Sequence, residues 1–294
     1  EGAEGTLVLV DRQGEVNNLT LALDNYLYPR FSPDGTRVAV QINDATGDSN
    51  IFIYELAGNR LRQLTFDGGT VPLWTPDGTQ VTFLTNDELW NVASDFSEEP
   101  KLLSVASEEV GIGGPYSWSP NGKVLFWSAA GDLNQLALLE DGGVEHSPLL
   151  REPYGEVNPR FSANGNWFVY ESNETGSEVY VHPYPPDSGV KRRITQSGGL
   201  NPVWAGSGRE LFYENDGQLW VVRISMEPVL EWQDPVALFE NRWRLDFGDF
   251  NNYDVSPDGQ QFVFVQLVTD SGELNRINVV LNWFEELKER VPVP

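Results

Sequence analysis

Carboxylates and arginines are the residues of this sequence that could do chemistry, and Asp34 is the first to stand out. It lies in the stretch YPRFSPDGTRVAV (residues 28–40), between a proline and a glycine. An exposed carboxylate on a tight loop can act as a general base, as a metal ligand or as part of a turn. Proline before it and glycine after it favour a turn, because proline presets φ and glycine accepts a positive φ. The four residues Ser-Pro-Asp-Gly at 32–35 form a tetrad that recurs in the sequence. Its copies at residues 119–122 and 162–165 carry asparagine in place of Asp34, so the position requires no carboxylate.

Metal sites built from imidazole or thiolate are not expected. The chain has no cysteine, and its two histidines, His146 and His182, fall in different repeats. Calcium is the more plausible cation, because Asp44, Asp48 and Asn50 of the stretch DATGDSN offer clustered hard oxygen ligands. The alternative is a polar hairpin loop with a central glycine. The stretch SNETGSE (172–178) occupies the equivalent place in another repeat, between its second and third strands. We expect the loop, and we expect no cofactor.

Enzymatic chemistry has little support in the sequence. The chain contains no G-x-S-x-G pentad of a serine hydrolase and none of the H-R-D or D-F-G motifs of a kinase. Acidic pairs such as Glu98-Glu99 are frequent because the whole chain is acidic, so no pair marks a glycosidase. We therefore expect a protein that is not an enzyme.

The charge of the chain limits its partners. Its 294 residues include 44 acidic and 19 basic side chains, which gives a net charge of −25. Such a surface repels phosphate backbones, so nucleic acid is not an expected partner. No run of 18 apolar residues occurs, and no charged-then-apolar leader opens the sequence. We expect no direct membrane insertion and no signal peptide in the chain as given.

A repeat of about 43 residues organises the whole sequence. The last glycines of six Ser-Pro-Asp-Gly-like tetrads fall at 35, 78, 122, 165, 208 and 259. An aromatic residue precedes five of them, and three further β-rich runs follow each tetrad or precede the next. Four short strands per repeat, separated by Gly, Asp and Asn turns, are typical of a propeller blade. The sequence predicts an all-β fold, a six-bladed β-propeller of four-stranded blades.

The two ends of the chain are predicted to share one blade. The N-terminal segment TLVLVDRQGEVNNLT (6–20) aligns with the third and fourth strands at 51–65, so an N-terminal strand closes the ring. Seven segments resemble the third strand of a blade, including INVV (277–280), whereas the sequence has only six tetrads. Either the closing blade has a fifth strand or residues 7–10 lie outside the ring. We expect one domain over residues 1–294. Its parts are closing strands at 1–23, blades at about 24–66, 67–104, 111–150, 154–195, 198–240 and 249–284, and a short helical tail at 284–291.

The pattern Phe/Trp-Ser-Pro-Asp-Gly-x-x-apolar-x-apolar resembles the TolB-type six-bladed β-propeller repeat. With TLVLVDRQG leading into YPRFSPDG and the ending INVVLNWFEELKERV, the chain is most similar to propeller domains attached to bacterial serine/threonine kinases. The resemblance implies a sensor or interaction domain of a larger bacterial envelope protein. It also implies an extracytoplasmic or periplasmic location, and a chain fused to or partnered with a membrane-anchored protein. A repeat of this kind specifies a fold rather than a function.

The candidate binding site follows from the repeat, because the connections leading into the innermost strands should meet at one mouth of the central channel. Aromatic and amide side chains there suit recognition. Arg30 and Arg160 occupy equivalent positions in opposite blades and could clamp an anionic group. The alternative is that each arginine pairs with an acidic residue of a neighbouring blade. The predicted ligand-binding residues are Tyr28, Arg30, Tyr116, Tyr154, Arg160, Asn201 and Tyr253.

The expected function is therefore non-catalytic binding of a peptide, protein or small-molecule ligand at the channel mouth. The alternative is a hydrolase or lyase acting on a glycan or peptide at the same place. A third reading is a scaffold whose acidic outer surface meets a basic partner, and binding of that kind should weaken steeply with added salt.

Overall fold

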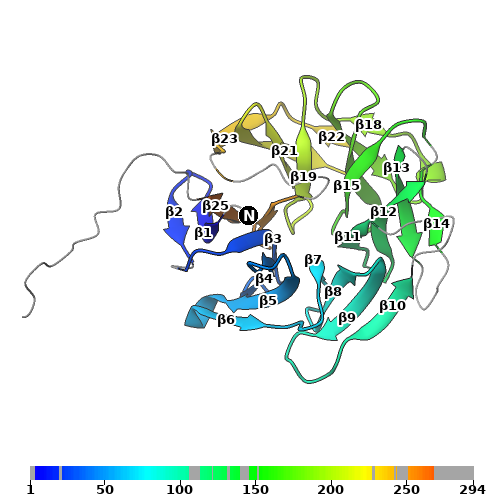
Figure 1. The fold of residues 1–294 in the computed structure, drawn as a ribbon. Coiled ribbons are helices and arrows are strands. Elements are labelled where there is room, and N and C mark those ends of the chain that lie inside the picture. Colours follow the sequence, from blue (N-terminus) through cyan, green and yellow to red (C-terminus); the bar gives the residue numbers. More distant parts are fainter. Residues whose placement is uncertain are drawn as a thin grey trace, which may run out of the picture.

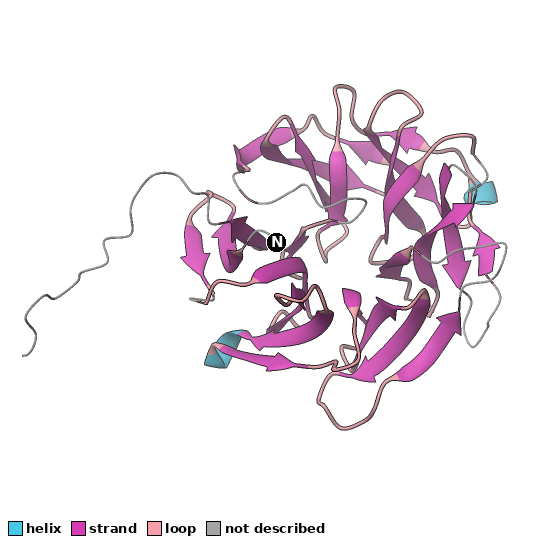
Figure 2. Ribbon diagram, viewed as in Figure 1, coloured by secondary structure: helices cyan, strands magenta, loops and turns pink. Residues whose placement is uncertain are grey.

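The structure is a computed structural model that describes residues 4–19, 22–105, 113–120, 122–130, 133–139, 146–150, 152–226, 229–241, 243 and 251–267. The predicted strand at 277–280 and the predicted helical tail at 284–291 lie outside these residues. Within them the regular secondary structure is almost entirely strand, and the two single-turn 3-10 helices, η1 (Leu56–Gly58) and η2 (Pro186–Ser188), lie at the outer rim (Figure 2).

The strands form six sheets arranged around a centre, as in a propeller (Figure 1). Their strands follow in chain order. The first two sheets are β3 (Asn25–Phe31), β4 (Arg37–Asn43), β5 (Ser49–Glu55) and β6 (Arg60–Gln63), then β7 (Thr70–Trp74), β8 (Gln80–Thr85), β9 (Glu88–Ala93) and β10 (Lys101–Val105). The next two are β11 (Gly114–Trp118), β12 (Val124–Ala130), β13 (Leu133–Leu139) and β14 (His146–Pro148), then β15 (Glu156–Phe161), β16 (Trp167–Ser172), β17 (Glu178–Pro183) and β18 (Arg192–Arg193). The expected all-β propeller with four-stranded blades is confirmed.

The fifth sheet departs from the four-strand expectation. It contains β19 (Leu200–Trp204), β20 (Glu210–Asn215), β21 (Gln218–Ser225), β22 (Glu231–Trp232) and β23 (Val236–Glu240). Both β22 and β23 pair with β21, one with each end of it. At eight residues β21 is long enough to accept two short partners in succession, and the sequence motif gave no sign of this. Five sheets therefore have four strands and this one has five.

The last sheet joins the N-terminal strands to the last two strands that the structure describes. It runs in the order β2 (Val16–Asn18), β1 (Gly5–Asp11), β25 (Gln261–Leu267) and β24 (Tyr253–Val255). Strand β1 pairs antiparallel with β25 along its whole length, from Gly5 opposite Leu267 to Asp11 opposite Gln261. Residues 7–10 therefore lie within this sheet and are its third strand.

Aromatic side chains hold neighbouring blades together. The indole of Trp74 donates a hydrogen bond to the Arg30 carbonyl of the preceding blade, at 2.9 Å. Trp204, at the equivalent repeat position, donates to the Arg160 carbonyl at 3.2 Å. Because each tryptophan also buries a large apolar surface, one side chain supplies both packing and a specific hydrogen bond between blades. This accounts for the aromatic residue that precedes the tetrads.

The tetrads are tight turns between the first and second strand of each blade. Gly35, Gly78, Gly165 and Gly259 all have φ between 69° and 70°. The Asp34 carboxylate accepts hydrogen bonds from the Ser32 hydroxyl and from the backbone N–H and hydroxyl of Thr36. A Cβ on Gly35 would meet Pro257 of the adjacent tetrad at 3.2 Å, so the turns also pack against each other. Asp34 is confirmed as a turn residue.

Replacement of Asp34 by asparagine is expected to change the free energy of unfolding by less than about 0.5 kcal/mol, and replacement by alanine to lower it by about 1–2 kcal/mol. The reason is that an amide oxygen can accept the same hydrogen bonds, as Asn164 does from the Ser162 hydroxyl and the Asn166 N–H. Denaturant unfolding of the two variants checks this. An equal loss in both would show that the charge, not the acceptor, stabilises the turn.

Among the described residues, no helix is long and apolar enough to cross a membrane.

Candidate functional site

The innermost strands of the six sheets surround the centre of the molecule (Figure 1). A cavity of about 570 Å³ lies between them. Its wall is built in layers, because each inner strand contributes side chains from equivalent repeat positions. The layer nearest the turns consists of the second residue of each tetrad: Pro33, Pro76, Pro120, Ala163, Gly206 and Pro257. The next layer consists of the residues before the tetrads: Phe31, Trp74, Trp118, Phe161, Trp204 and Val255. The cavity therefore has a wall of prolines and aromatic rings at the turn end of the inner strands.

Deeper in the cavity lies a cluster of two arginines and one aspartate. Arg30 of β3, Arg160 of β15 and Asp254 of β24 occupy the same repeat position, two residues before their tetrads, and all three line the cavity. The repeat register therefore brings them together from three different blades. Two guanidinium groups against one carboxylate make this a positively charged spot in a chain of net charge −25.

Arg30 is held by backbone carbonyl groups. Its side chain is almost fully buried and donates hydrogen bonds to the carbonyl oxygens of Pro29 and Asn251, both at 2.8 Å, and of Tyr253 at 3.3 Å. Burial, and then the nearby Arg160 guanidinium, lower the pKa of Arg30 to about 9. The residue still carries its charge at neutral pH, and that charge has no carboxylate directly hydrogen-bonded to it in these contacts.

The guanidinium group of Arg160 has fewer hydrogen-bond partners among the described residues than that of Arg30. Its Nη1 lies 3.6 Å from Oδ1 of Asp254, and the side chain is 12% exposed. The Nε and Nη2 atoms are buried and have no hydrogen-bond partner among the described residues. Asp254 is shared, because its Oδ2 also accepts a hydrogen bond from the Phe31 N–H at 2.9 Å. Unpaired buried donors on a cation are costly, so this guanidinium is prepared to bind an acceptor that enters the cavity.

The inner strands carry a β-bulge just before these residues. In the blades of β3, β7, β15 and β19 the register shifts by one residue, and the extra residue has positive φ in each: Tyr28, Val71, Asn158 and Asn201, at 52° to 54°. A bulge bends the strand and redirects the side chains that follow it. After the bulge, regular pairing with the next strand starts again at Arg30 in β3 and at Arg160 in β15. The bulge therefore helps to orient both arginine side chains.

A network of buried amides lies at the bulge position. Asn158 donates to the Asn201 side chain at 2.9 Å, and the Asn201 amide donates to Glu214 at 3.4 Å. The Asn252 side chain accepts from the Tyr28 N–H at 2.8 Å. Hydrogen bonds stabilise polar groups this deep, and the Asn158–Asn201 and Tyr28–Asn252 bonds cross blade boundaries. The predicted role of Asn201 as a ligand-binding residue therefore competes with its part in this network.

The structure divides the seven predicted binding residues into two groups. Arg30, Tyr116 and Arg160 line the central cavity. The other four, Tyr28, Tyr154, Asn201 and Tyr253, do not line it. Tyr253 is fully buried and donates its hydroxyl to the Asn201 carbonyl at 2.8 Å. Tyr28, Tyr154 and Asn201 lie farther from their tetrads than the cavity-lining residues do. Tyr253 stands at the same repeat position as Tyr116, three residues before its tetrad, but packs in the core instead.

Three kinds of cavity residue were not predicted from the sequence. They are Asp254, the aromatic layer as a cavity wall and the second tetrad residues. The repeat register could have found Asp254, because it stands two residues before its tetrad as Arg30 and Arg160 do.

The calcium candidate residues have partners within the protein. The Asp44 carboxylate accepts hydrogen bonds from the N–H groups of Thr46 and Asp48, which closes the loop between β4 and β5. The Asn50 side chain accepts from the Thr65 hydroxyl and from the Gly68 N–H. In the part of the chain that the structure describes, no group of three His, Cys, Asp or Glu side chains is arranged to hold a metal ion.

His182 is a packed residue of β17. Its ring stacks on Phe168 with centroids 5.3 Å apart, and Nδ1 lies 3.0 Å from the Pro183 carbonyl oxygen. Burial lowers the pKa of His182 below its usual value, so the neutral ring is favoured.

Comparisons with known proteins agree on the fold. No protein-family model matches the sequence. An uncharacterized peptidase of Bacillus subtilis, YuxL, is 28% identical over 264 residues, which is 84% of this chain and 30% of that protein. The chain thus spans less than a third of this relative's length.

Solved structures resemble the chain more completely. A candidate TolB protein of Agrobacterium tumefaciens has a TM-score of 0.70 at 16% identity and covers 92% of this chain and 100% of its own. TolB of Acinetobacter baumannii has a TM-score of 0.59 at 17% identity, covering 80% of this chain and 66% of its own. Oligogalacturonate lyase of Vibrio parahaemolyticus has a TM-score of 0.57 at 14% identity, covering 92% and 99%. The chain therefore has a TolB-like β-propeller fold.

Proposed function

We propose that this protein is a non-catalytic binding propeller that recognises an anionic group, in particular a carboxylate of a peptide, protein or small molecule, in the central cavity. The observation that carries the proposal is Arg160, whose buried Nε and Nη2 find no hydrogen-bond partner in the part of the chain that the structure describes. A carboxylate can accept two parallel hydrogen bonds from one guanidinium fork, which gives both energy and orientation.

The rest of the cavity suits such a ligand. Arg30 adds a second positive charge behind Arg160, and an incoming anion would relieve the repulsion between the two. Asp254 alone offsets the two cations. The surrounding prolines and aromatic rings exclude water, which strengthens the ion pair, and they offer apolar contact to the remainder of the ligand. A volume of about 570 Å³ can hold a few residues of a peptide end or a small organic acid.

The biological setting of this binding is part of the proposal. We infer a sensor or interaction domain within a larger bacterial envelope protein, linked to a kinase and located outside the cytoplasm. The inference rests on the resemblance of the repeat and of the two chain ends to kinase-linked propellers.

The competing function is a hydrolase or lyase at the same cavity. The relative named as a peptidase and the lyase among the similar structures are what favour it. The relative is matched over 30% of its length, and the lyase is 14% identical, so neither assigns an activity to these residues.

The test is to replace Arg160 by alanine and measure binding of a mixed-sequence tetrapeptide pool with free α-carboxylates, by calorimetry. We expect affinity to fall by about tenfold to a hundredfold, because a bidentate charge-assisted pair is lost. Lysine at 160 should restore only part of it, since an ammonium is a point charge.

Two controls make the result specific. The exposed Arg192→Ala variant should bind as the parent does, and the same pool with amidated C-termini should bind weakly to every variant. Unchanged affinity in the Arg160→Ala variant, or in the Arg30→Ala and Arg160→Ala double variant, would refute the clamp. Release of products from the peptide pool or from oligogalacturonate would support the enzyme instead.

A further inference from the structure

A second cavity lies between the first two sheets, away from the centre. Its volume is about 450 Å³, and its walls come from the β6–β7 connection, the β8–β9 hairpin and the β9–β10 connection. Alternate residues of β9, namely Glu88, Trp90 and Val92, face it, as expected for one side of a strand. None of its lining residues lines the central cavity.

Aromatic rings form much of this pocket. Phe83 is buried at its base, while Trp90 and Phe96 are half-buried. Phe66 at its edge is 74% exposed, which is unusual for an aromatic side chain on a monomer surface. One ring already meets a cation, because the guanidinium carbon of Arg62 lies 3.7 Å from the centroid of Phe96. Phe96 thus already contacts a cation of the chain itself, and an exposed ring such as Phe66 can attract positive charge through its quadrupole.

The charged residues of the pocket all have one sign. Asp67, Glu88, Glu98 and Glu99 line it, and none of its fifteen lining residues is basic. Glu88 is held by a hydrogen bond from the indole of Trp90 at 3.1 Å, so one carboxylate is fixed at the edge of one aromatic ring.

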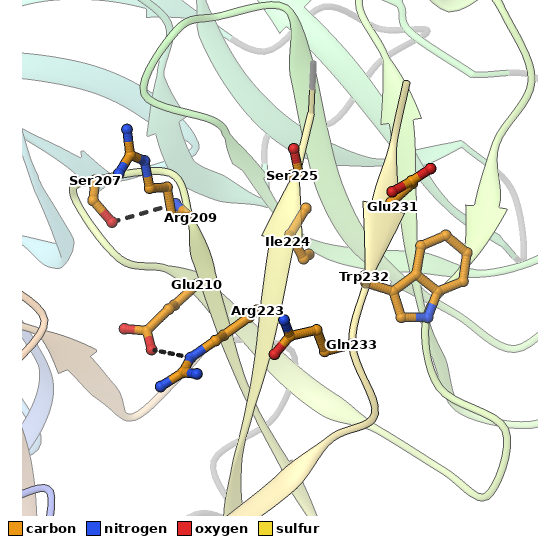
Figure 3. Close-up of a pocket in the computed structure, with 9 residues that line it drawn as sticks. All are labelled: Ser207, Arg209, Glu210, Arg223, Ile224, Ser225, Glu231, Trp232 and Gln233. Carbon is orange, nitrogen blue, oxygen red and sulfur yellow. Dashed lines mark hydrogen bonds and ion pairs between the residues drawn. The ribbon is translucent and has the colours of Figure 1, made fainter. Parts of the chain in front are cut away.

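A larger cavity on the fifth sheet shows the contrast. It has a volume of about 600 Å³ and is lined by side chains of both signs (Figure 3). There Arg223 turns toward Glu210, with Nε 3.8 Å from Oε1, and Glu210 also binds Arg12. Its charges are balanced within the protein. The pocket between the first two sheets keeps an acidic excess instead. Lys101 pairs with Glu98 at 2.5 Å and Arg62 stacks on Phe96, so four lining carboxylates meet two cations of the chain.

We propose that the pocket lined by Phe66, Trp90 and Phe96 binds the arginine or lysine side chain of a partner polypeptide. The aliphatic stem would lie along the rings and the cationic head would reach the carboxylates. A net charge of −25 on the whole chain would steer such a partner toward the protein. This site is independent of the carboxylate site proposed for the central cavity.

The experiment is a calorimetric titration with two matched peptides, Ac-Gly-Arg-Gly-NH₂ and Ac-Gly-citrulline-Gly-NH₂. Citrulline has nearly the shape of arginine but no charge. We expect the arginine peptide to bind at least about tenfold more tightly, with an affinity that falls as salt is added. Equal affinity of the two peptides, or no binding of the arginine peptide at millimolar concentration, would overturn the proposal.

Variants locate the binding. Phe66→Ala removes an exposed ring without touching the core, and the Glu88→Gln and Glu99→Gln pair removes two charges while keeping the acceptor for Trp90. Each should weaken binding of the arginine peptide by about five- to tenfold. A matched control is the Trp232→Ala and Glu231→Gln pair on the fifth sheet, which should bind as the parent does. Arg160→Ala should also bind as the parent does, so failure here is distinct from failure of the central clamp. Parent-like binding by both pocket variants would contradict the site.

Discussion

Aspartate in place of Val10 is expected to abolish folding or to lower the free energy of unfolding by at least about 4 kcal/mol. Val10 belongs to β1, is fully buried and stands opposite Phe262 in β25. It packs in one core cluster with Phe212 of the fifth sheet and Phe264 of the last. A carboxylate there would be an unpaired charge between two blades. A loss of this size is comparable with the whole stability of many domains.

Val16 provides the matched control. It stands opposite Val10 on the neighbouring strand β2, yet it is 48% exposed. Val16→Asp should change the free energy of unfolding by less than about 0.5 kcal/mol. Denaturant unfolding followed by tryptophan fluorescence measures both variants. If Val10→Asp is no more harmful than Val16→Asp, then β1 does not complete the last sheet in solution.

Glutamine in place of Glu156 is expected to stabilise the protein at neutral pH by roughly 3 kcal/mol and to have little effect at pH 4. Glu156 begins β15 and is 1% exposed. Burial, and then the nearby Glu152 carboxylate, raise the pKa of Glu156 to about 8, and Lys191 offsets this only in part. Glu174 adds to the rise, and the buried hydroxyl of Tyr170 lies in the same electrostatic environment.

The pH dependence of this stability difference follows from proton linkage. In the unfolded chain Glu156 ionises near pH 4.5, whereas in the folded protein it holds its proton up to about pH 8. Folding therefore takes up a proton between these values. The contribution of the protonated carboxyl to stability is full below pH 4.5 and is lost as the pH rises toward 8.

The measurement is the free energy of unfolding of the parent, Glu156→Gln and the exposed control Glu15→Gln from pH 4 to pH 8. The difference between Glu156→Gln and the parent should grow by about 1.4 kcal/mol per pH unit above pH 4.5. Glu15→Gln should follow the parent throughout. A pH-independent difference for Glu156→Gln would mean that this carboxyl is not held protonated.

The fold was predictable because the repeat is written in local chemistry. A glycine with positive φ ends all six turns, and a proline with an asparagine or aspartate stands before it in four of them. An aromatic residue before the turn marks the inner strand in five copies, because it packs between blades, and Trp74 and Trp204 also donate a hydrogen bond to the preceding blade. These constraints recur often enough to be visible in one sequence.

The site was only partly predictable because its contacts are not local. The alignment of repeats placed Arg30 and Arg160 at equivalent positions, but their partners come from the inner strand of another blade. Arg30 is held by backbone carbonyls, which no side-chain pattern encodes. The bulge at Val71 could not be read either, because a β-branched residue rarely adopts positive φ. Aromatic residues such as Tyr253 were expected at a surface and instead fill the core.

The most direct test of the proposed function is the NMR signal of the Arg160 Nε–H group during titration with a peptide. This atom is buried and no described residue accepts a hydrogen bond from it, so a bound carboxylate should change its chemical shift. We predict a saturable shift with the free-carboxylate tetrapeptide pool and no comparable shift with the amidated pool. Equal shifts with both pools, or binding of the free-carboxylate pool that leaves the Arg160 signal in place, would contradict recognition of an anion in the central cavity.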